Sequence, residues 1–308
     1  MKIIRWDGKP ITKPGIYSGI PIDKYHSPIC DGPEISSTGL RAIILDSALH
    51  YWDTSYLNPN RAPDDPTAVE SVYFRIGRAS HTLMLEPQKF ERLYTKRPKE
   101  FDSWRTQASR DWRDAAQTKG WTVLSEEEWL QVEGIARALH EHRWHAQGII
   151  GGLIETSMIA RDPKTGIWLK SRPDSFPLDS AFTDLKITTS AKPVDAGRST
   201  KRLGYDIQMA LAGVCLYLLT GRTIDQFWLI FCESKRPHAI HVSALGLAQI
   251  YWSRIRIRGA LDKLAQCLKE NYWPSYDMDG ADVLPTKWEA EDFEAQQKAG
   301  LLPKEDAF

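Results

Sequence analysis

The pattern of hydrophobic and polar residues changes character near residue 150 of this 308-residue chain. Before that point, apolar residues recur at helical spacing through long segments. After it, they alternate with polar residues in short segments. The first pattern predicts three long helices. They cover residues 35–57, residues 68–94 with a break near Glu86 and Pro87, and residues 125–144 after a Ser cap.

The segment after residue 150 predicts strands interleaved with helices. Apolar residues alternate on both sides of "RDPKTG", which indicates a hairpin. Three further strands, "AFTDLKIT", "IDQFWLIFCES" and "HAIHVSAL", are expected, together with helices over 204–221 and 246–271, the first of them preceded by a basic loop. This order predicts an α/β fold with one central mixed β-sheet flanked by helices, and a helical N-terminal lobe.

The domain organisation follows from the same pattern and from charge. We expect one domain over residues 1–276, with the helical lobe over about 35–145 and the core over about 150–272. Residues 1–34, rich in Pro, Gly and Ile, are expected to be extended and irregular. Residues 277–308 carry nine acidic and three basic residues, which indicates an acidic C-terminal extension.

Composition excludes several classes of protein. Apolar residues make up 42% of the chain and there are twelve Trp, which is ample for a core, but no run of eighteen apolar residues predicts a membrane span. The four Cys lie far apart with no CxxC, which argues against a zinc or iron–sulfur module. With no apolar signal-peptide region, the expected location is the cytoplasm.

The formal net charge is zero, so the acidic extension leaves the first 276 residues with a net charge of +6. Basic residues cluster in "KPVDAGRSTKR" (192–202) and "RIRIR" (254–258). A modest basic surface fits a protein that touches phosphate, although many other proteins share it.

Asp174, Asp184 and Lys186 are the notable charged residues of the segment "SRPDSFPLDSAFTDLKIT" (171–188). Asp184 and Lys186 are two apart on a predicted strand and share one face, while Leu185 points the opposite way into apolar packing. If the flanking strands pair, Asp174 can approach Asp184. One interpretation is a solvated hairpin face with an incidental ion pair. The other is a metal site, because two close carboxylates repel each other unless a cation lies between them.

Three more polar residues stand in suggestive places. Glu155 begins the first strand after residue 150, His81 lies in the middle of an apolar helix, and Gln208 lies on the helix after the lysine strand. Each has an ordinary structural explanation. A lone His on an apolar helix is more often a hydrogen-bonded core residue, a Glu at a strand start is usually solvated, and a Gln on a buried helix often caps backbone groups.

Taken in order, these residues resemble the PD-(D/E)xK nuclease superfamily. "GRASHTLMLEPQKF", "IET" with "SRPDSF", "DLKITT" and "GYDIQMAL" resemble its RecE, or exonuclease VIII, branch of phage and prophage recombination nucleases. "YHSPICDGPEISSTGLRAIILDSALHYW" is similar to the N-terminal helix of that branch. The resemblance covers roughly residues 15–275. It implies a PD-(D/E)xK nuclease core.

The resemblance implies roles for individual residues. Asp174 and Asp184 would be the central metal ligands, with the carbonyl of Leu185 beside them. His81 would ligate or border a second metal, and Glu155 would complete the acidic cluster. Lys186 would position the attacking water, and Gln208 would orient Lys186 or contact the DNA backbone. The implied cofactor is Mg²⁺, with Mn²⁺ as a substitute.

One position departs from the family pattern. Relatives often carry Tyr four residues after this Gln, and here that residue is Ala212. Tyr205 or Tyr217 could substitute, so the role of a Tyr stays open.

The resemblance further implies a metal-dependent exodeoxyribonuclease that degrades duplex ends 5′ to 3′ for recombination by strand annealing. Its expected partners are double-stranded DNA ends, a single-strand annealing protein, and copies of itself in a ring such as a tetramer. The alternatives are a structure-specific or restriction-type endonuclease and a catalytically silent DNA-binding protein. An iron–sulfur nuclease of the CRISPR-adaptation type would need clustered Cys near the C-terminus, which are absent. There is also no GxxxxGK[ST] motif for an ATP-driven motor.

The DNA-binding candidates lie in two segments. Ser37 and Arg41 belong to the predicted N-terminal helix, whose first N–H groups could bind a 5′-phosphate. The alternative there is an ordinary helix cap with a solvated Arg. The basic segment 192–202 contributes Arg198, Lys201 and Arg202.

Overall fold

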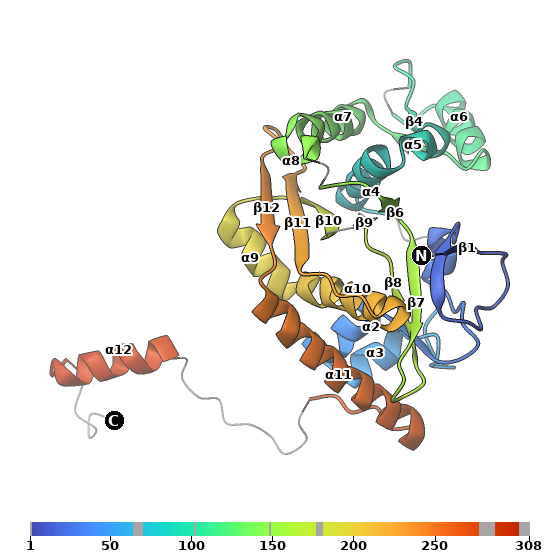
Figure 1. The fold of residues 1–308 in the computed structure, drawn as a ribbon. Helices are drawn as coiled ribbons and strands as arrows, with labels where there is room; N and C mark the ends of the chain where they lie inside the picture. The colour runs from blue at the N-terminus through green and yellow to red at the C-terminus, as the bar shows by residue number, and fades with distance from the viewer. Residues whose placement is uncertain are drawn as a thin grey trace. The chain divides into compact units, whose positions relative to one another are not determined.

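The computed structural model describes residues 2–63, 70–101, 103–147, 149–176, 181–276 and 287–301. Its internal contacts divide the chain into two units, Met1–Trp273 and Pro274–Phe308. The second unit contains one described helix, α12 (Lys287–Lys298). The first unit contains the sheets and the helices that cover them (Figure 1).

A five-stranded mixed sheet lies at the centre of this unit, in the order β12-β11-β10-β9-β6. Its two long strands, β10 (Ala181–Thr188) and β11 (Gln226–Glu233), run parallel over eight residue pairs. The short strands β12 (Ile240–Ala244), β9 (Ser175–Phe176) and β6 (Leu153–Ile154) each join antiparallel to their neighbours. The α/β class predicted from sequence is confirmed.

Five other strands form a second sheet, in the order β1-β2-β7-β8-β3. The predicted hairpin is present here as β7 (Ser157–Arg161) and β8 (Trp168–Ser171). Its other strands are β1 (Ile3–Arg5), β2 (Gly15–Ser18) and β3 (Glu34–Ser36), with the short helix α1 (Ile22–Tyr25) between them. The expectation of a single sheet was therefore wrong, because residues 1–36, mostly expected to be irregular, supply three strands that join the β7–β8 hairpin in a second sheet.

Helices cover both faces of the central sheet. On one face lie α10 (Tyr205–Thr220) and α11 (Leu247–Glu270), and their apolar side chains pack with Phe182, Phe227 and Phe231 of the sheet. On the other face, α4 (Val72–Leu85) and α7 (Glu126–Glu141) pack with Leu185, Ile230 and Cys232. Because side chains alternate along β10, this arrangement sends Leu185 toward α4 and α7 and leaves Asp184 and Lys186 on the α10 side.

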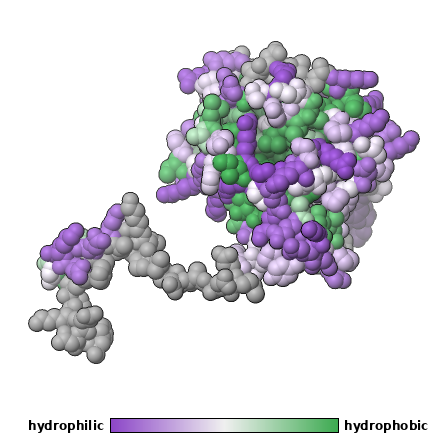
Figure 2. Space-filling model, turned by 60° about the horizontal axis from the view of Figure 1, so that its bottom comes forward, coloured by the Kyte–Doolittle hydropathy of each residue, from purple (hydrophilic) through white to green (hydrophobic). Residues whose placement is uncertain are grey.

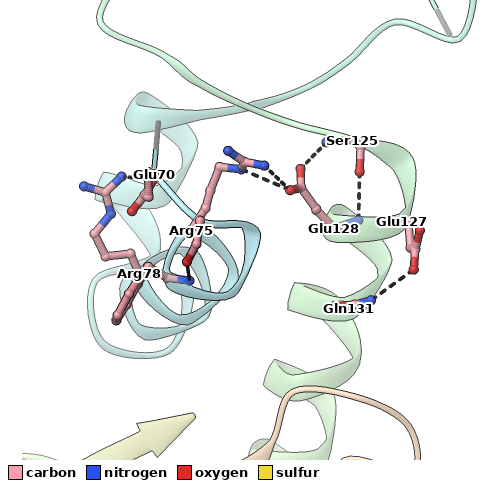
Figure 3. Close-up of polar contacts among 9 residues, drawn as sticks. Glu70, Arg75, Arg78, Ser125, Glu127, Glu128 and Gln131 are labelled. Carbon is pink, nitrogen blue, oxygen red and sulfur yellow. Dashed lines mark hydrogen bonds and ion pairs between the residues drawn. The ribbon is translucent and has the colours of Figure 1, made fainter. Parts of the chain in front are cut away.

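Helix α4 is fixed against α7 by charge as well as by packing (Figure 3). The Arg75 guanidinium donates to Oε1 of Glu128, and Oε2 of Glu128 accepts the Ser125 N–H at 2.7 Å. Ser125 and Glu128 thereby close a capping box at the start of α7. The smaller elements of this lobe are α5 (Pro87–Leu93), α6 (Gln107–Thr118) and α8 (Arg143–Ala146), with β4 (Tyr94–Lys96) paired to β5 (Thr122–Leu124).

Two local predictions were wrong. The single helix expected over 35–57 is divided into α2 (Ser37–Arg41), a π-helical turn (Ala42–Asp46) and α3 (Ala48–Thr54), because Ser47 is extended and caps α3. The basic loop before residue 204 contains a helix, α9 (Pro193–Arg202). Pro193 occupies the first turn of α9, where its fixed φ favours helix and its missing N–H costs nothing.

The surface keeps several apolar side chains exposed among hydrophilic ones, as the view in Figure 2 shows. The exposed large apolar and aromatic side chains of α11 are Leu247, Tyr251, Trp252 and Ile255. No single helix in the described part of the chain has the length and apolarity to cross a membrane. The bent pair formed by α9 and α10 meets that test only as a pair, by length and composition.

Candidate active site

Strand β10 presents the first two site residues. Asp184 is fully buried, and its Oδ2 forms an ion pair with the Lys186 ammonium two residues on. That oxygen accepts no well-directed hydrogen bond among the described residues. Leu185 lies between them, with its side chain buried on the opposite face as the alternation predicted. One strand thus places a carboxylate and an ammonium side by side at the centre of the sheet.

Asp174 is delivered to this strand by the antiparallel pairing of β9 with β10. Ser175 stands opposite Thr183, so the residue before Ser175 reaches the middle of β10. There, Oδ2 of Asp174 accepts the Leu185 N–H at 2.6 Å. The predicted approach of Asp174 to the Asp184–Lys186 segment is therefore present in the fold.

His81 reaches the same carboxylate from α4, on the other face of the sheet. Its Nε2 lies 2.7 Å from Oδ2 of Asp174, and its Nδ1 lies 3.4 Å from Oε1 of Glu155. Both ring nitrogens of His81 therefore face carboxylates, an arrangement that suits a metal ligand and also a hydrogen-bonded core histidine.

Glu155 is held in an unusual backbone conformation. It lies in the connection between β6 and β7 rather than at a strand start, with φ of +49°. Residues other than Gly seldom adopt this backbone conformation, and strained conformations of this kind are concentrated at functional sites. The Glu155 N–H donates to the Asp174 carbonyl at 3.2 Å, which links the two acidic residues through the backbone.

The donor atoms of His81, Glu155 and Asp174 fit a divalent cation. One ligand atom from each of them lies within 4.8 Å of the others. Two carboxylate oxygens and one imidazole nitrogen can ligate a divalent metal ion whose remaining positions are filled by water. The oxygens of Asp184 stand next to this group but are occupied by Lys186 and Gln208.

The charges of the site perturb one another strongly. Burial and the charge of Asp174 raise the pKa of Glu155 to about 7, and the same two causes raise the pKa of Asp184 to about 6. Burial opposes ionisation of Asp174 as well, but the neighbouring His81 charge lowers its pKa. Burial disfavours the His81 cation, yet Asp174 prevails and raises the pKa of His81 to about 9. Carboxylates whose ionisation is this unfavourable indicate a place for positive charge.

Lys186 is enclosed by three groups. Besides Asp184, it donates to Oε1 of Gln208 at 3.1 Å, and Gln208 donates in turn to Oδ1 of Asp184 at 2.7 Å. The third group is the Tyr205 ring, whose centroid lies 4.3 Å from the Lys186 Nζ. Burial disfavours the ammonium, but the Asp184 carboxylate outweighs it and raises the pKa of Lys186. The surroundings of Lys186 therefore favour its protonated form.

Sequence reasoning left Tyr205 undecided and missed Arg172. Tyr205 lies three residues before Gln208, which places both on one face of α10, whereas Tyr217 lies three turns further along. Arg172 stacks on Tyr25 with its Cζ 4.3 Å from the ring centroid and donates to Ser157 Oγ at 2.8 Å, and its charge helps to lower the pKa of Glu155. Its place two residues before Asp174 was the available signal.

The predicted DNA-binding residues lie in two settings. Arg41 is directed at the end of α9, where it donates to the Leu203 carbonyl at 3.0 Å and to Thr38 Oγ1 at 3.2 Å. Ser37 is the first residue of α2. Arg198, Lys201 and Arg202 are exposed on α9, with Arg198 near Asp195 and Lys201 bonded to Gln249.

The second basic cluster, 254–258, is not a free surface. Arg258 pairs with Asp162 and Asp262 at 2.8 and 2.7 Å, and Arg256 lies 4.0 Å from Asp206. These arginines tie α11 to the β7–β8 turn and to α10.

Comparison with known protein families gives one match, over residues 58–283, to a family described as "PDDEXK-like domain of unknown function (DUF3799)". The chain belongs to this family. The PD-(D/E)xK resemblance drawn from the sequence is thereby confirmed. A comparison with curated proteins finds no match.

One solved structure of low sequence identity shares the fold, and two others match with lower TM-scores. A candidate exonuclease from Eubacterium rectale is 14% identical, with a TM-score of 0.58 over 90% of this chain and 98% of its own. A phage-related exonuclease from Haemophilus somnus 129PT is 12% identical, with a TM-score of 0.31 over 78% of this chain and 96% of its own. The alkaline exonuclease LHK-Exo from Laribacter hongkongensis is 13% identical, with a TM-score of 0.26 over 59% of this chain and 94% of its own.

Within this PDDEXK-like domain, the structure brings the residues that match the family motif together on the central sheet. Asp174 supplies the Asp of the first half, and Asp184, Leu185 and Lys186 supply the DxK. A buried carboxylate cluster next to a protonated lysine can hold a cation and stabilise negative charge on a phosphate oxygen.

Proposed function

We propose that this protein is a Mg²⁺-dependent DNA exonuclease, active also with Mn²⁺, which hydrolyses phosphodiester bonds from duplex ends. The observation that carries the proposal is the convergence of Asp174, Asp184 and Lys186 on the middle of β10, with His81 and Glu155 alongside. The cation would supply an activated water and neutralise developing charge on the phosphate.

The residues of the chain have separate tasks in this proposal. His81, Glu155 and Asp174 hold the cation. Asp184 completes the acidic cluster and fixes the Lys186 ammonium beside it. Lys186, as an ammonium, positions the attacking water and stabilises the charge that builds on the phosphate oxygens. Gln208 holds Lys186 and Asp184 together from α10.

Attack at ends, the 5′-to-3′ direction and a role in recombination rest on the RecE-like motifs. The single strand produced would serve a single-strand annealing partner. The exonuclease descriptions of proteins that share the fold support the choice of an exonuclease over an endonuclease.

The exposed basic side chains of α9 supply a path for DNA phosphates in this proposal. Arg198, Lys201 and Arg202 are spaced so that they share one side of the helix. Arg41 lies at the end of α9, and the charge of Asp184 acts on its guanidinium. In this proposal it therefore contacts a phosphate close to the reacting bond. Ser37 lies one turn before Arg41. Assembly into a ring of copies would gather several weakly basic surfaces around one duplex.

The test compares linear and covalently closed duplexes of the same sequence, with either 5′-phosphate or 5′-hydroxyl ends on the linear form. An exonuclease degrades the linear duplex in Mg²⁺ and leaves the closed circle intact. Cleavage of the circle at a comparable rate would identify an endonuclease. Specific binding of both forms without cleavage in either metal would identify a silent DNA-binding protein.

A further inference from the structure

One face of α4 leads from exposed aromatic side chains to the metal-binding cluster. Phe74, Gly77 and His81 are spaced by three and four residues, so they follow one another along this face. Two turns of helix separate Phe74 from His81, a distance of about 10 Å. Phe74 is 67% exposed.

Phe74 is a firmly placed aromatic rather than a loose one. Its ring lies edge-on to the ring of Tyr73, with centroids 5.8 Å apart. The Tyr73 hydroxyl donates to the carbonyl of Ile187 at 2.7 Å, one residue after Lys186 on β10. The aromatic pair is therefore attached to the strand that carries the catalytic lysine.

Gly77 has no structural reason to be glycine. A Cβ at this position would meet no atom within 4 Å, and the φ of Gly77 is that of ordinary helix. Glycine inside a helix costs about 1 kcal/mol relative to alanine, so its use here points to something that must approach from the solvent side. The result is a smooth strip of backbone between Phe74 and His81.

We propose that Phe74 stacks against an unpaired nucleobase of the DNA substrate, while the backbone of that strand passes over Gly77 toward His81. Aromatic rings next to a phosphate site are typical of single-strand recognition, since every base has a π-face. The proposal rests on the proposed nuclease function and specifies its substrate as a strand whose end is already unpaired at the site.

Binding in the absence of metal tests this separately from cleavage. The probe is a duplex with a short single-stranded end that carries 2-aminopurine, titrated in EDTA with wild type, Phe74→Ala, Phe74→Trp and Leu130→Ala. Leu130 is a matched control, an exposed apolar residue on α7. Phe74→Ala should weaken binding about tenfold and abolish the fluorescence quenching, Phe74→Trp should retain both, and Leu130→Ala should change neither. Equal binding and quenching by Phe74→Ala and wild type would overturn the stacking.

Gly77→Leu tests the path of the strand. Leucine is the better helix former, so the melting temperature should hold or rise. Binding of the same probe should nevertheless weaken about tenfold or more, because the side chain occupies the strip. Unchanged binding would overturn the path. Normal binding by wild type without cleavage in Mg²⁺ would refute the nuclease function alone.

A second, independent observation concerns Tyr205. Its ring lies over the Lys186 ammonium on one side and against buried Phe231 on the other, with ring centroids 6.2 Å apart. Gly204 before it has φ of +64°, and a Cβ there would lie 2.8 Å from the Arg41 side chain. The turn that aims Tyr205 at Lys186 thus requires glycine and is clamped by Arg41.

We infer that Tyr205 is a positioning residue for Lys186 and acts through the face of its ring. Asp184 and Gln208 bind the ammonium by directed contacts, and the ring closes a third side by a cation–π contact. The proposal rests on the role of Lys186 in the proposed function. It requires an aromatic ring at this position but no hydroxyl.

Two measurements test the inference. In cleavage assays, Tyr205→Phe should keep kcat within about threefold, whereas Tyr205→Leu should lower kcat about tenfold with KM unchanged. Tyr217→Leu, an exposed site on the same helix, should have no effect. In thermal melts of the metal-free protein, Tyr205→Leu should lower the melting temperature in the parent but much less in a Lys186→Met background.

Three outcomes would overturn the role of the ring. They are equal loss of kcat in Tyr205→Phe and Tyr205→Leu, an unchanged kcat in Tyr205→Leu, and an equal thermal cost in both backgrounds. The melts need no cleavage activity, so they remain decisive even for a protein that does not cut DNA.

Discussion

The Nε2 atom of His81 lies 2.7 Å from Oδ2 of Asp174, although 93 residues separate the two in the chain. This contact joins α4, on one face of the central sheet, to the turn that precedes β9. Because Asp174 raises the pKa of His81 to about 9, the histidine is protonated at neutral pH in the metal-free protein. A cation bound here replaces the proton of His81 as the partner of the carboxylates.

His81→Ala is therefore expected to weaken metal binding more than the chemistry. The concentration of Mg²⁺ needed for half-maximal cleavage should rise about tenfold or more, while the rate at saturating metal stays within about tenfold of wild type. The measurement is a metal titration of the cleavage rate. A loss that saturating metal does not recover, together with loss of the cooperative thermal transition, would support a structural histidine instead.

Stability in EDTA should depend on pH through Glu155. Its folded pKa is raised to about 7, so the folded state binds more protons than the unfolded state and stability falls as pH rises from about 4.5 through 7. Glu155→Gln removes this dependence. In EDTA, the melting temperature of Glu155→Gln minus that of wild type should increase from pH 5 to pH 8. In saturating Mg²⁺, wild type should instead have the higher melting temperature. A constant difference across this pH range would contradict the assignment.

Asp184→Asn is expected to stop cleavage and to leave the fold intact. The pKa of Asp184 is raised to about 6 by burial and by Asp174, so its charge is unfavourable in the metal-free protein at pH 8. The melting temperature in EDTA should therefore hold or rise, while the cleavage rate falls about 10³-fold. A near-wild-type cleavage rate in this variant would show that the site is wrongly assigned.

Gln208→Leu should have an intermediate effect. Gln208 bridges Lys186 and Asp184 but touches neither the cation-binding group nor, in our proposal, the reacting atoms. We expect cleavage to fall about tenfold to a hundredfold, less than in Lys186→Ala. Gln131→Leu on α7, where the Gln131 side chain donates a hydrogen bond to Glu127 of the same helix, is the matched control (Figure 3). A loss as deep as that of Lys186→Ala would give Gln208 a direct part in the reaction.

The sequence predicted best those features that depend on residues close together in the chain. The alternation of Asp184, Leu185 and Lys186 is a property of one strand, and it was read correctly together with the hairpin that delivers Asp174. The helix after Ser125 and the break at Pro87 were likewise marked by caps and by proline. Such signals act over a few residues, so they can be read without the tertiary structure.

The features that were missed depend on contacts distant in the chain. The arginines of 254–258 form a basic cluster in sequence, but Asp162, on a turn 96 residues away from Arg258, neutralises part of it. Helix α9 has few apolar residues to show its period, and it is fixed by Arg41 of α2. The positive φ of Glu155 and the ring of Tyr205 over Lys186 have no signature in a single strand or helix.

The most direct test of the central claim is digestion of an end-labelled linear duplex by wild type and Lys186→Ala, each with Mg²⁺ and with EDTA. Wild type in Mg²⁺ should release the label from the end progressively, and wild type in EDTA should release none. In Mg²⁺, Lys186→Ala should release the label about 10³-fold more slowly than wild type. Full activity in excess chelator, or a Lys186→Ala rate equal to that of wild type, would contradict the metal-dependent nuclease site.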